Sequence, residues 1–348
     1  MTEAIRYAVV FAASFAAALG LTPVAARIAR RYDIQDRPAA NKFHASPTPY
    51  LGGLAVLAAM LIGPMVVGGW RGQLVAVGGG AFAMFVLGLV DDVRTVGPGT
   101  KVMVETAAAL GLWAAGVRGG LFGNVADLPF TILWVVAVTN ALNLLDNMDG
   151  VLSGVAAISA FAFFLIAAFE GDYLVASLAL AVAASSLGFL RYNFPPARIF
   201  LGDAGSLTLG FLLAAIGLKL DLVGPSGIAR SVIPVLILGV PLFDTCLVVV
   251  ARVLGRRPIL LGSLDHTSHR LASLGLPVGR VAATVYGAQI FLITVALWMI
   301  GASTTSVIAV IAMLSVTAVA ITAALLRVGP VAPTVSAEPI RGVVEAAG

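Results

Sequence analysis

Long apolar segments dominate this 348-residue chain and limit what it can fold into. Hydrophobic residues make up 60% of the sequence, charged residues only 11%, and the mean hydropathy is +1.03. Runs of about 17–25 apolar residues are long enough to cross a bilayer as helices, whereas open strands would leave backbone groups unpaired in lipid. The sequence therefore predicts an all-α, polytopic integral membrane protein. The single cysteine, Cys246, excludes a disulfide framework and a cysteine-based metal site.

Eleven candidate transmembrane helices result when the chain is divided at clusters of charged residues, proline and glycine. They are residues 4–26, 51–68, 74–90, 102–118, 129–145, 154–170, 174–190, 205–221, 231–251, 281–300 and 306–326. We interpret residues 1–326 as one transmembrane domain and residues 327–348 as a disordered tail. A cleaved signal peptide is the alternative for the first segment. Its start is poorly basic and an arginine cluster follows it, which favours an uncleaved span.

Lys and Arg residues are distributed unequally between the predicted loops, with sixteen on one side of the membrane and five on the other. Because cytoplasmic loops carry the basic excess, we expect the N-terminus outside and the C-terminus in the cytoplasm. The same orientation places five aspartates at cytoplasmic ends of hydrophobic segments. A charged side chain at the bilayer centre costs about 2.5–3.5 kcal/mol, so these recurring acids are candidate functional residues. They are Asp91, Asp92, Asp146, Asp149 and Asp203.

The first acidic motif is GLVDDVRTVGPGTK, residues 88–101, in which Asp91 and Asp92 are adjacent. Adjacent carboxylates repel, so keeping both ionised usually requires a cation or a basic neighbour. A solvated helix end balanced by Arg94 is one interpretation. Lys101, at the end of the short loop that follows, instead suits a site for phosphate and a metal ion.

A regular polar stripe marks the second motif, TNALNLLDNMDG, residues 139–150. Asn140, Asn143, Asp146 and Asp149 recur at every third position, which keeps their side chains close to one face of a helix. Such a stripe can be a hydrogen-bonding seam between membrane helices. Two carboxylates within it favour a binding site.

The third motif, RYNFPPARIFLGDAGSLTLG, spans residues 191–210. Two prolines interrupt the helix here, and a small-residue turn comes directly before the next span. The free N–H groups of that helix start suit an anion, and Asp203 is either the helix cap or a metal ligand.

The basic loop before the tenth predicted span places His266 and His269 beside Arg270 in the sequence DHTSHRL. Two histidines and one aspartate without cysteine are a weak zinc signal. Imidazole and guanidinium groups also bind diphosphate oxygens, and we favour phosphate over zinc. Asp244 lies within the ninth predicted span, where structural support is favoured over a proton site.

In order along the chain, these motifs resemble the polyprenyl-phosphate N-acetylhexosamine-1-phosphate transferases of glycosyltransferase family 4. KFHASPTPYLGG is similar to the early cytoplasmic motif of that family, and VDD with the downstream Lys101 is similar to its aspartate pair. NALNLLDNMDG is similar to NxxNxxDGxDG, PPARIFLGDAGSLTLG to PAxxFxGDxGSLxLG, and DHTSHRL to the histidine-rich loop. Eleven spans and a cytoplasmic C-terminus resemble the GlcNAc-1-phosphate branch more than the phospho-MurNAc-pentapeptide branch.

Three features depart from the family pattern. Asn147 replaces the first glycine of DGxDG, HxxH replaces a longer histidine cluster, and Glu105 stands where glutamine is expected. These departures bear on the choice of donor more than on the reaction.

The resemblance implies a cell-membrane enzyme that transfers a HexNAc 1-phosphate from a UDP-sugar to undecaprenyl or decaprenyl phosphate. Transfer at the cytoplasmic face releases UMP and starts cell-envelope polysaccharide synthesis. UDP-GlcNAc is the favoured donor, and MurNAc-pentapeptide or another sugar is the alternative. Mg²⁺, with Mn²⁺ as a second choice, suits a reaction that must neutralise two anions. Membrane lipids and a second copy of the chain are further expected partners, and nucleic acid is not.

The resemblance also implies roles for individual residues. The expected catalytic residues are Asp91, Asp92 and Asp203, and the expected metal ligands are Asp203, Asp92 and Asp149. The nucleotide-sugar and phosphate groups are expected to contact Lys42, Thr48, Lys101, Asn143, Asp146, Asp149, His266, His269 and Arg270.

Two other classes of protein share some of these features. Acids and broken helices within the membrane also occur in transporters, but here the acids gather at one face and not at the midplane. A CDP-alcohol phosphotransferase would carry further aspartates at helical spacing after Gly150, and residues 151–154 supply none.

Overall fold

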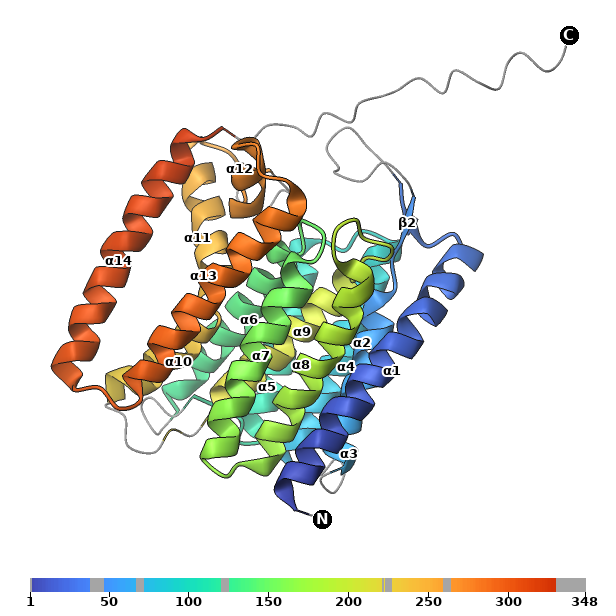
Figure 1. The fold of residues 1–348 in the computed structure, drawn as a ribbon, viewed down its shortest axis with the longest axis horizontal. Helices are drawn as coiled ribbons and strands as arrows, with labels where there is room; N and C mark the ends of the chain where they lie inside the picture. The colour runs from blue at the N-terminus through green and yellow to red at the C-terminus, as the bar shows by residue number, and fades with distance from the viewer. Residues whose placement is uncertain are drawn as a thin grey trace, which may run out of the picture.

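The computed structural model describes residues 2–37, 47–66, 72–119, 125–220, 222, 227–258 and 264–329. In these residues the secondary structure consists of fourteen helices and one small antiparallel sheet, which confirms the all-α class. The sheet pairs β1 (Gln35–Asp36) with β2 (Thr48–Pro49) and was not predicted. Figure 1 shows most of the long helices side by side along one direction, with β2 and α12 at the same end of the molecule.

Except for the short α12, the helices fall where the apolar segments predict them. Their bounds are α1 Glu3–Arg31, α2 Gly52–Met60, α3 Ile62–Val66, α4 Gln73–Val93, α5 Pro98–Ala114, α6 Asp127–Leu145, α7 Val151–Phe169, α8 Tyr173–Asn193, α9 Gly202–Lys219, α10 Gly227–Ile237, α11 Gly239–Leu254, α12 Thr267–Ser273, α13 Val278–Met299 and α14 Thr304–Arg327.

Among the described helices, seven are long and apolar enough to cross a membrane: α1, α4, α6, α7, α8, α13 and α14. The pair α10 and α11, bent by 76°, adds an eighth if it forms one span. The other three predicted spans correspond to α2 and α3, which a break at Leu61 separates, to α5, which has only 17 residues, and to α9, whose 18 residues carry a charged residue near each end. The helices thus fit a polytopic membrane protein. The count of eleven, the orientation and the single domain over residues 1–326 stay predictions, and the predicted tail lies outside the described residues after Gly329.

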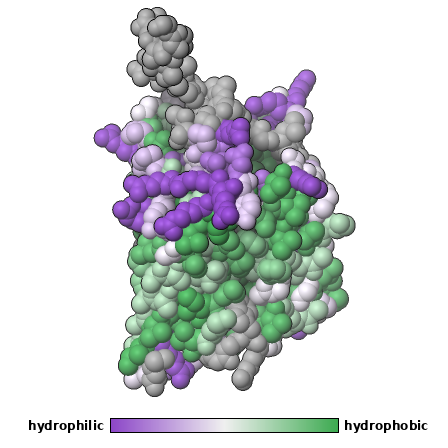
Figure 2. Space-filling model, turned by 90° about the vertical axis from the view of Figure 1, so that its right-hand side faces the viewer, coloured by the Kyte–Doolittle hydropathy of each residue, from purple (hydrophilic) through white to green (hydrophobic). Residues whose placement is uncertain are grey.

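Surface hydropathy divides the molecule along the helix axes. Figure 2, which faces the side where α1 lies, shows a broad hydrophobic surface bordered by extended hydrophilic side chains near the end that carries β2. The last helix, α14, exposes large apolar side chains such as Val316 and Val319, which are 71% and 70% exposed. An apolar belt of this kind is what helices present to lipid.

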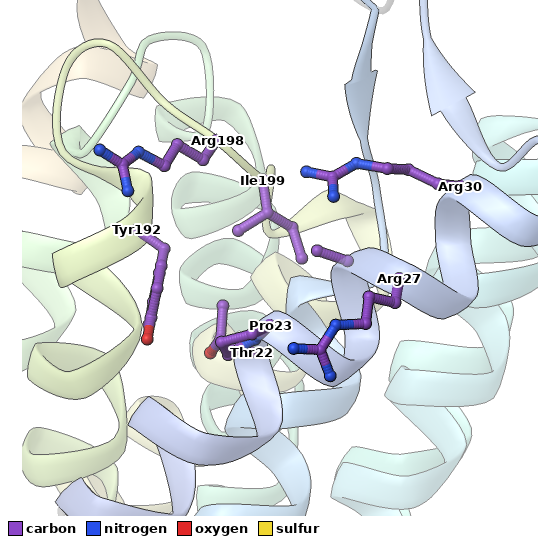
Figure 3. A pocket seen from close by; sticks show the side chains of 8 residues that line it. Thr22, Pro23, Arg27, Arg30, Tyr192, Arg198 and Ile199 are labelled. Atoms are coloured by element: carbon purple, nitrogen blue, oxygen red, sulfur yellow. The ribbon is translucent and has the colours of Figure 1, made fainter.

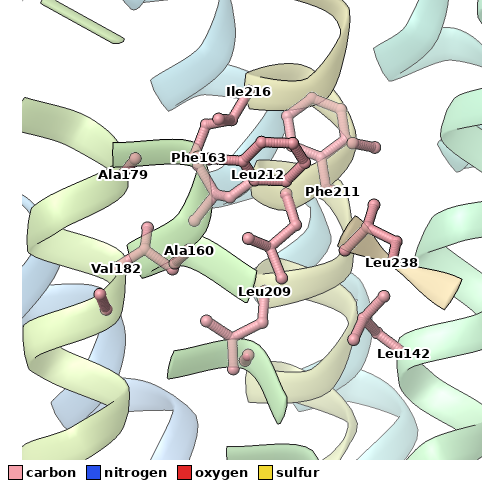
Figure 4. Close-up of a cluster of buried hydrophobic side chains, with 14 of the residues drawn as sticks. Leu142, Ala160, Phe163, Ala179, Val182, Leu209, Phe211, Leu212, Ile216 and Leu238 are labelled. Carbon is pink, nitrogen blue, oxygen red and sulfur yellow. The ribbon is translucent and has the colours of Figure 1, made fainter. Parts of the chain in front are cut away.

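The helix at the centre of the bundle is α9, which packs against α4 and α6 and is also contacted by α7 and α8. Leu209, Phe211, Leu212 and Ile216 are buried around its circumference, as Figure 4 illustrates. A helix that is apolar on every side is typical of such a buried position. Because α9 is held on all sides, the residues at its N-terminus, including Asp203, have a fixed position.

Candidate active site

Lys101 lies between two of the predicted aspartates. Its Nζ is 2.5 Å from Oδ2 of Asp91 and 2.7 Å from Oδ2 of Asp203. These three residues come from the end of α4, the first turn of α5 and the start of α9, so three helices converge at this point. All three side chains are only partly exposed, which strengthens the interaction between their charges. The structure therefore joins two motifs that are 102 positions apart in the sequence.

Asp92 caps the N-terminus of α9 from the neighbouring helix α4. Its two carboxylate oxygens accept hydrogen bonds from the backbone N–H of Asp203, at 2.8 Å, and of Ala204, at 3.2 Å. A carboxylate at this position satisfies free N–H groups and interacts favourably with the helix dipole. Since Asp92 supplies the cap, the side chain of Asp203 is directed to Lys101 and Asn143 instead.

Two glycines permit this close approach of α4 and α9. A Cβ at Gly88 would lie 2.3 Å from the backbone of Asp203, nearer than any side chain can be placed. Gly202 has φ +74°, and a Cβ there would lie 2.6 Å from Oδ2 of Asp92. Glycine tolerates both the positive φ and the short contact, so the cap by Asp92 depends on these two residues.

The polar stripe on α6 serves two neighbouring helices. Asn143 donates through Nδ2 to Oδ1 of Asp203, at 3.0 Å, and to Oγ of Ser206, at 2.8 Å. Asn140 donates to Oε2 of the buried Glu105 on α5, at 2.6 Å. The first part of the stripe is therefore a hydrogen-bonding seam, and Asn143 also belongs to the acidic site.

The second half of the stripe lies beyond the helix, because α6 ends at Leu145. Oδ2 of Asp149 accepts a hydrogen bond from the backbone N–H of Ala197, at 2.8 Å. Burial raises the pKa of Asp146 to about 8, and the nearby carboxylates of Asp203, Asp92 and Asp149 raise it as well. Acids from three motifs thus share one region, and a cation bound there would favour their ionised forms.

Asn193, at the end of α8, anchors the two loops that carry these acids. Its Oδ1 accepts from the backbone N–H of Gly150, at 3.1 Å, and from Oγ of Ser153, at 2.7 Å. Its Nδ2 donates to the carbonyl of Ile199, at 3.1 Å. The hydroxyl of Tyr286 on α13 donates to the carbonyl of Gly150, at 2.6 Å. Neither Asn193 nor Tyr286 was predicted as a site residue, although polar side chains within apolar helices were the available signal.

Asn147, which departs from the glycine of the family motif, connects this region to the histidine loop. Its Nδ2 donates to the carbonyl of Leu144, at 2.8 Å, and its Oδ1 accepts from Oγ of Ser268 on α12. A glycine has no side chain for either bond. The departure thus has a structural use in this chain.

Asp244, on α11, holds the first turn of the histidine loop. Its Oδ2 lies 2.7 Å from Nδ1 of His266, and its Oδ1 accepts from the backbone N–H of Thr267, at 2.6 Å. Asp244 is 1% exposed and His266 is 4% exposed. These two bonds agree with the structural support predicted for Asp244, and its role stays a prediction.

Two further residues of the loop, His269 and Arg270, are also buried. Burial, and then the neighbouring His266, lower the pKa of His269 to about 4, so its imidazole is neutral at physiological pH. Arg270 donates through Nε and Nη2 to Asp265, and through Nη1 to the carbonyls of Leu325 and Val328 at the end of α14. The guanidinium therefore positions the loop, and its predicted contact with phosphate stays a prediction.

The N-terminal motif contributes β2, which pairs with β1 from the preceding segment. Thr48 lies on β2 and is 3% exposed, whereas Lys42 lies outside the described residues. The neighbouring Tyr50 has a raised pKa because its hydroxyl is buried and hydrogen-bonded to Asp36, and because Asp92 and Asp146 lie near it. Tyr50 stands in the motif that resembles the family but was not selected as a site residue.

The chain is similar in sequence to proteins of a known family. The family model described as "Glycosyl transferase family 4" matches residues 74–221, which run from α4 to the end of α9. The Bacillus subtilis protein named "Probable undecaprenyl-phosphate N-acetylglucosaminyl 1-phosphate transferase" is 35% identical over 293 residues, covering 81% of this chain and 82% of that protein. The chain belongs to glycosyl transferase family 4. The matched region of this family 4 protein contains Asp91, Asp92, Lys101, Asn143, Asp146, Asp149 and Asp203.

Two other relatives represent both branches of the family. The "Decaprenyl-phosphate N-acetylglucosaminephosphotransferase" of Mycobacterium leprae is 30% identical over 298 residues, or 74% of this chain and 75% of that protein. The "Phospho-N-acetylmuramoyl-pentapeptide-transferase" of Lactiplantibacillus plantarum is 34% identical over 209 residues, or 50% of this chain and 62% of that protein. The family 4 protein is thus similar over a greater length to the two GlcNAc-phosphate relatives.

Proposed function

We propose that this family 4 protein transfers GlcNAc 1-phosphate from UDP-GlcNAc to a polyprenyl phosphate at the cytoplasmic face of the cell membrane. The observation that carries the proposal is the bridge from Lys101 to Asp91 and Asp203, where three helix ends meet. The names of the B. subtilis and M. leprae relatives include a polyprenyl phosphate and a GlcNAc phosphate. These names support a polyprenyl phosphate as the acceptor and GlcNAc as the sugar.

In this reaction an oxygen of the acceptor phosphate attacks the phosphorus that carries the sugar. The bond between that phosphorus and the bridging oxygen of UDP-GlcNAc breaks, and the electron pair leaves with UMP. Both reactants are anions, so binding and positioning charge is the main task of the protein. Lys101 supplies a fixed cation between two helix ends, and Asp91 orients the acceptor through this lysine.

A proton need not be removed from the acceptor at neutral pH, because the second pKa of a phosphate monoester is about 6. Asp91 therefore positions the acceptor phosphate more than it acts as a base. His266 and His269 are held at the edge of the same region by Asp244 and by the bond from Ser268 to Asn147. They are suited to donate hydrogen bonds to the donor diphosphate.

The carboxylates of this site are the kind of ligand that a magnesium ion takes. Within the described residues no three His, Cys, Asp or Glu side chains are grouped to hold a metal unaided, but Mg²⁺ usually takes one or two carboxylates with water and substrate phosphate. Asp203 would be the direct ligand, and Asp92 and Asp149 would orient the coordinated waters. When bound, Mg²⁺ would neutralise charge on the donor diphosphate.

The test uses the full-length chain purified in detergent, with UDP-GlcNAc, undecaprenyl phosphate and Mg²⁺. We expect UMP release, its loss on chelation of the metal, and a decrease of at least about 100-fold for Asp203→Asn. Asp33→Asn is the matched control, since Asp33 is exposed and forms an ion pair with Arg37 outside the site. Near-normal turnover by Asp203→Asn would exclude the proposed ligand.

Donor identity needs a separate comparison. UMP release is measured with UDP-GlcNAc, UDP-GalNAc and UDP-MurNAc-pentapeptide at equal concentrations. Activity with UDP-GlcNAc alone supports the proposal. Activity with only another donor would move the protein to a different branch of the family, but the transfer of a sugar 1-phosphate would still hold. No UMP from any donor would favour a transporter.

A further inference from the structure

A pocket separate from the acidic site lies between the C-terminal parts of α1 and α8 (Figure 3). Its volume is about 230 Å³, and its lining includes Thr22, Arg27 and Arg30 of α1, Tyr192 of α8, and Arg198 in the loop after α8. Figure 3 shows Arg27 and Arg30 extending from α1 towards the side where Tyr192 lies. Three arginine residues therefore line one small cavity.

The base of the pocket is formed by a local interruption of α1. Pro23 has no N–H group, so the carbonyl of Leu19 loses its usual partner within the helix. The hydroxyl of Tyr192 donates to this carbonyl, at 3.1 Å, and joins α8 to α1 at that level. The cavity opens beyond this bond, where the two helices continue to their C-terminal ends.

The three arginines have no anion to balance them within the part of the chain that is described. The ion pairs there involve other basic residues, and Arg27, Arg30 and Arg198 form no side-chain hydrogen bond. All three are exposed, so water surrounds their charges and an anion that enters the pocket can reach them. Guanidinium groups match the geometry of phosphate oxygens, which they bind through paired hydrogen bonds.

The pocket also lies beside an apolar surface. Leu21 and Val24 on α1 are 38% and 41% exposed, and Leu187 on α8 is 43% exposed, all on the membrane side of the arginines. Figure 2 views this side of the molecule and shows hydrophilic side chains along the border of the hydrophobic surface. Headgroups of a bilayer lie at such a border, and acyl chains lie below it. A soluble anion would use only the arginines, whereas a lipid would use both surfaces.

We propose that this pocket binds the phosphate group of an anionic membrane phospholipid. Basic pockets between membrane helices on the cytoplasmic side are suited to such headgroups. The proposal is independent of the transfer reaction, because binding requires no donor, acceptor or turnover.

Occupation of the pocket would restrain the loop that leads to the acidic site. The backbone N–H of Arg198 donates to the carbonyl of Tyr192, at 2.8 Å, and the preceding Ala197 donates to Asp149. Phe200, two residues further on, donates to the carbonyl of Pro49 in the hairpin, at 2.9 Å. A lipid held by Arg198 would therefore reduce the motion of residues 194–201.

Lipid selectivity provides the first test. The full-length protein is reconstituted in phosphatidylcholine vesicles that contain a small fraction of spin-labelled phosphatidylglycerol, and the immobilised fraction of the label is measured. We expect the double variant R27Q/R30Q to lower the relative affinity for phosphatidylglycerol about tenfold. R31Q/R191Q is the matched control, since it removes two exposed arginines from the ends of α1 and α8 that do not line the pocket.

The control should lose less than about twofold, because salt screens the attraction between exposed arginines and the membrane surface. Equal losses in the two double variants, or no loss in R27Q/R30Q, would overturn the proposal. Displacement of the lipid by millimolar inorganic phosphate would also overturn it, since a soluble anion would then suffice. Displacement by a stoichiometric amount of undecaprenyl phosphate would overturn it as well, because the pocket would then bind the acceptor and not a phospholipid.

Hydrogen exchange of residues 194–201 provides a second measurement. Phosphatidylglycerol vesicles should slow exchange in this loop relative to phosphatidylcholine vesicles in the wild type and in R31Q/R191Q. The effect should disappear in R27Q/R30Q. Equal protection in all three proteins would contradict a restraint through the pocket.

Discussion

The carboxylate of Asp244 and the imidazole of His266 lie 2.7 Å apart, although they belong to different helical segments and are both buried. Because Nδ1 is turned to this carboxylate, Nε2 is the ring nitrogen that is left for another partner. The same carboxylate also accepts from the backbone of Thr267, so it fixes both the ring and the start of α12. His266 therefore owes its orientation to a residue outside the loop.

Asp244→Asn keeps the shape of this side chain but can present an N–H group to the imidazole. Because a partner that orients a functional histidine typically contributes about 10–100-fold, we expect a decrease of that size in UMP release. The decrease should come with a changed pH profile, while Asp244→Glu retains part of the activity. An unchanged pH profile would indicate a purely structural role.

Lys101→Gln removes the cation between Asp91 and Asp203. The two carboxylates then face each other without a shared partner, and we expect turnover to fall by about 100-fold or more. Lys101→Arg should retain more activity, because it keeps the charge with a different geometry. Equal activity of the two variants would contradict a role that depends on charge. The assay is UMP release, with a thermal unfolding curve for each variant.

Gly88→Ala should disrupt the cap on α9, because the added Cβ would lie 2.3 Å from the backbone of Asp203. We expect a large loss of turnover and a lower unfolding temperature. Gly79→Ala, on the same helix, is the matched control, since its Cβ would meet nothing within 4 Å. It should be neutral or stabilising, by up to about 1 kcal/mol, because alanine favours helix more than glycine does. A loss in both variants would refute this explanation.

Glu105→Gln restores the residue that the family pattern leads one to expect. Glu105 is fully buried, and its Oε1 has no hydrogen-bond partner in the described structure. Since a buried carboxylate is costly and glutamine can still accept from Asn140, we expect an equal or higher unfolding temperature and near-normal turnover. Lower stability would show that the acid itself is required.

Stability should depend on pH through His269. Burial lowers the pKa of this imidazole to about 4, compared with about 6.5 in an unfolded chain. The unfolded state therefore binds more protons between these values, and stability should decrease as the pH falls from about 6.5 to 4, by at most about 3 kcal/mol. His269→Asn should reduce this slope in thermal unfolding experiments. A slope equal to that of the wild type would exclude His269 as its source.

The sequence predicts the helices well because each apolar run is long and is interrupted by strong breaking signals. The β1–β2 hairpin and α12 are too short for such a signal, and they depend on contacts with residues distant in the chain. Motif chemistry likewise identifies Asp91, Asp203 and Lys101 as candidates. Their mutual contact depends on how α4, α5 and α9 pack, and no spacing in the sequence encodes it.

Hydrogen-bonded supports are harder to predict than charged groups. Asn193 and Tyr286 resemble ordinary polar residues in membrane helices, and only the fold shows that both hold Gly150. Arg270 was predicted from its charge to contact phosphate. The fold adds a structural role, because its guanidinium donates to Asp265 and to the end of α14. Residue type predicts that a buried polar group needs partners, but packing decides which ones it finds.

The hydrogen bonds from Arg270 to the carbonyls of Leu325 and Val328 hold the histidine loop against the end of α14. A shortened chain that keeps Val328 retains both acceptors, whereas one that ends before Leu325 leaves the buried guanidinium with two unmet donors. Fusion tags and reporter domains are therefore best attached downstream of this point. A tether that pulls on α14 would therefore act on the loop through Arg270, which makes this helix a place to apply force to the protein away from the acidic site.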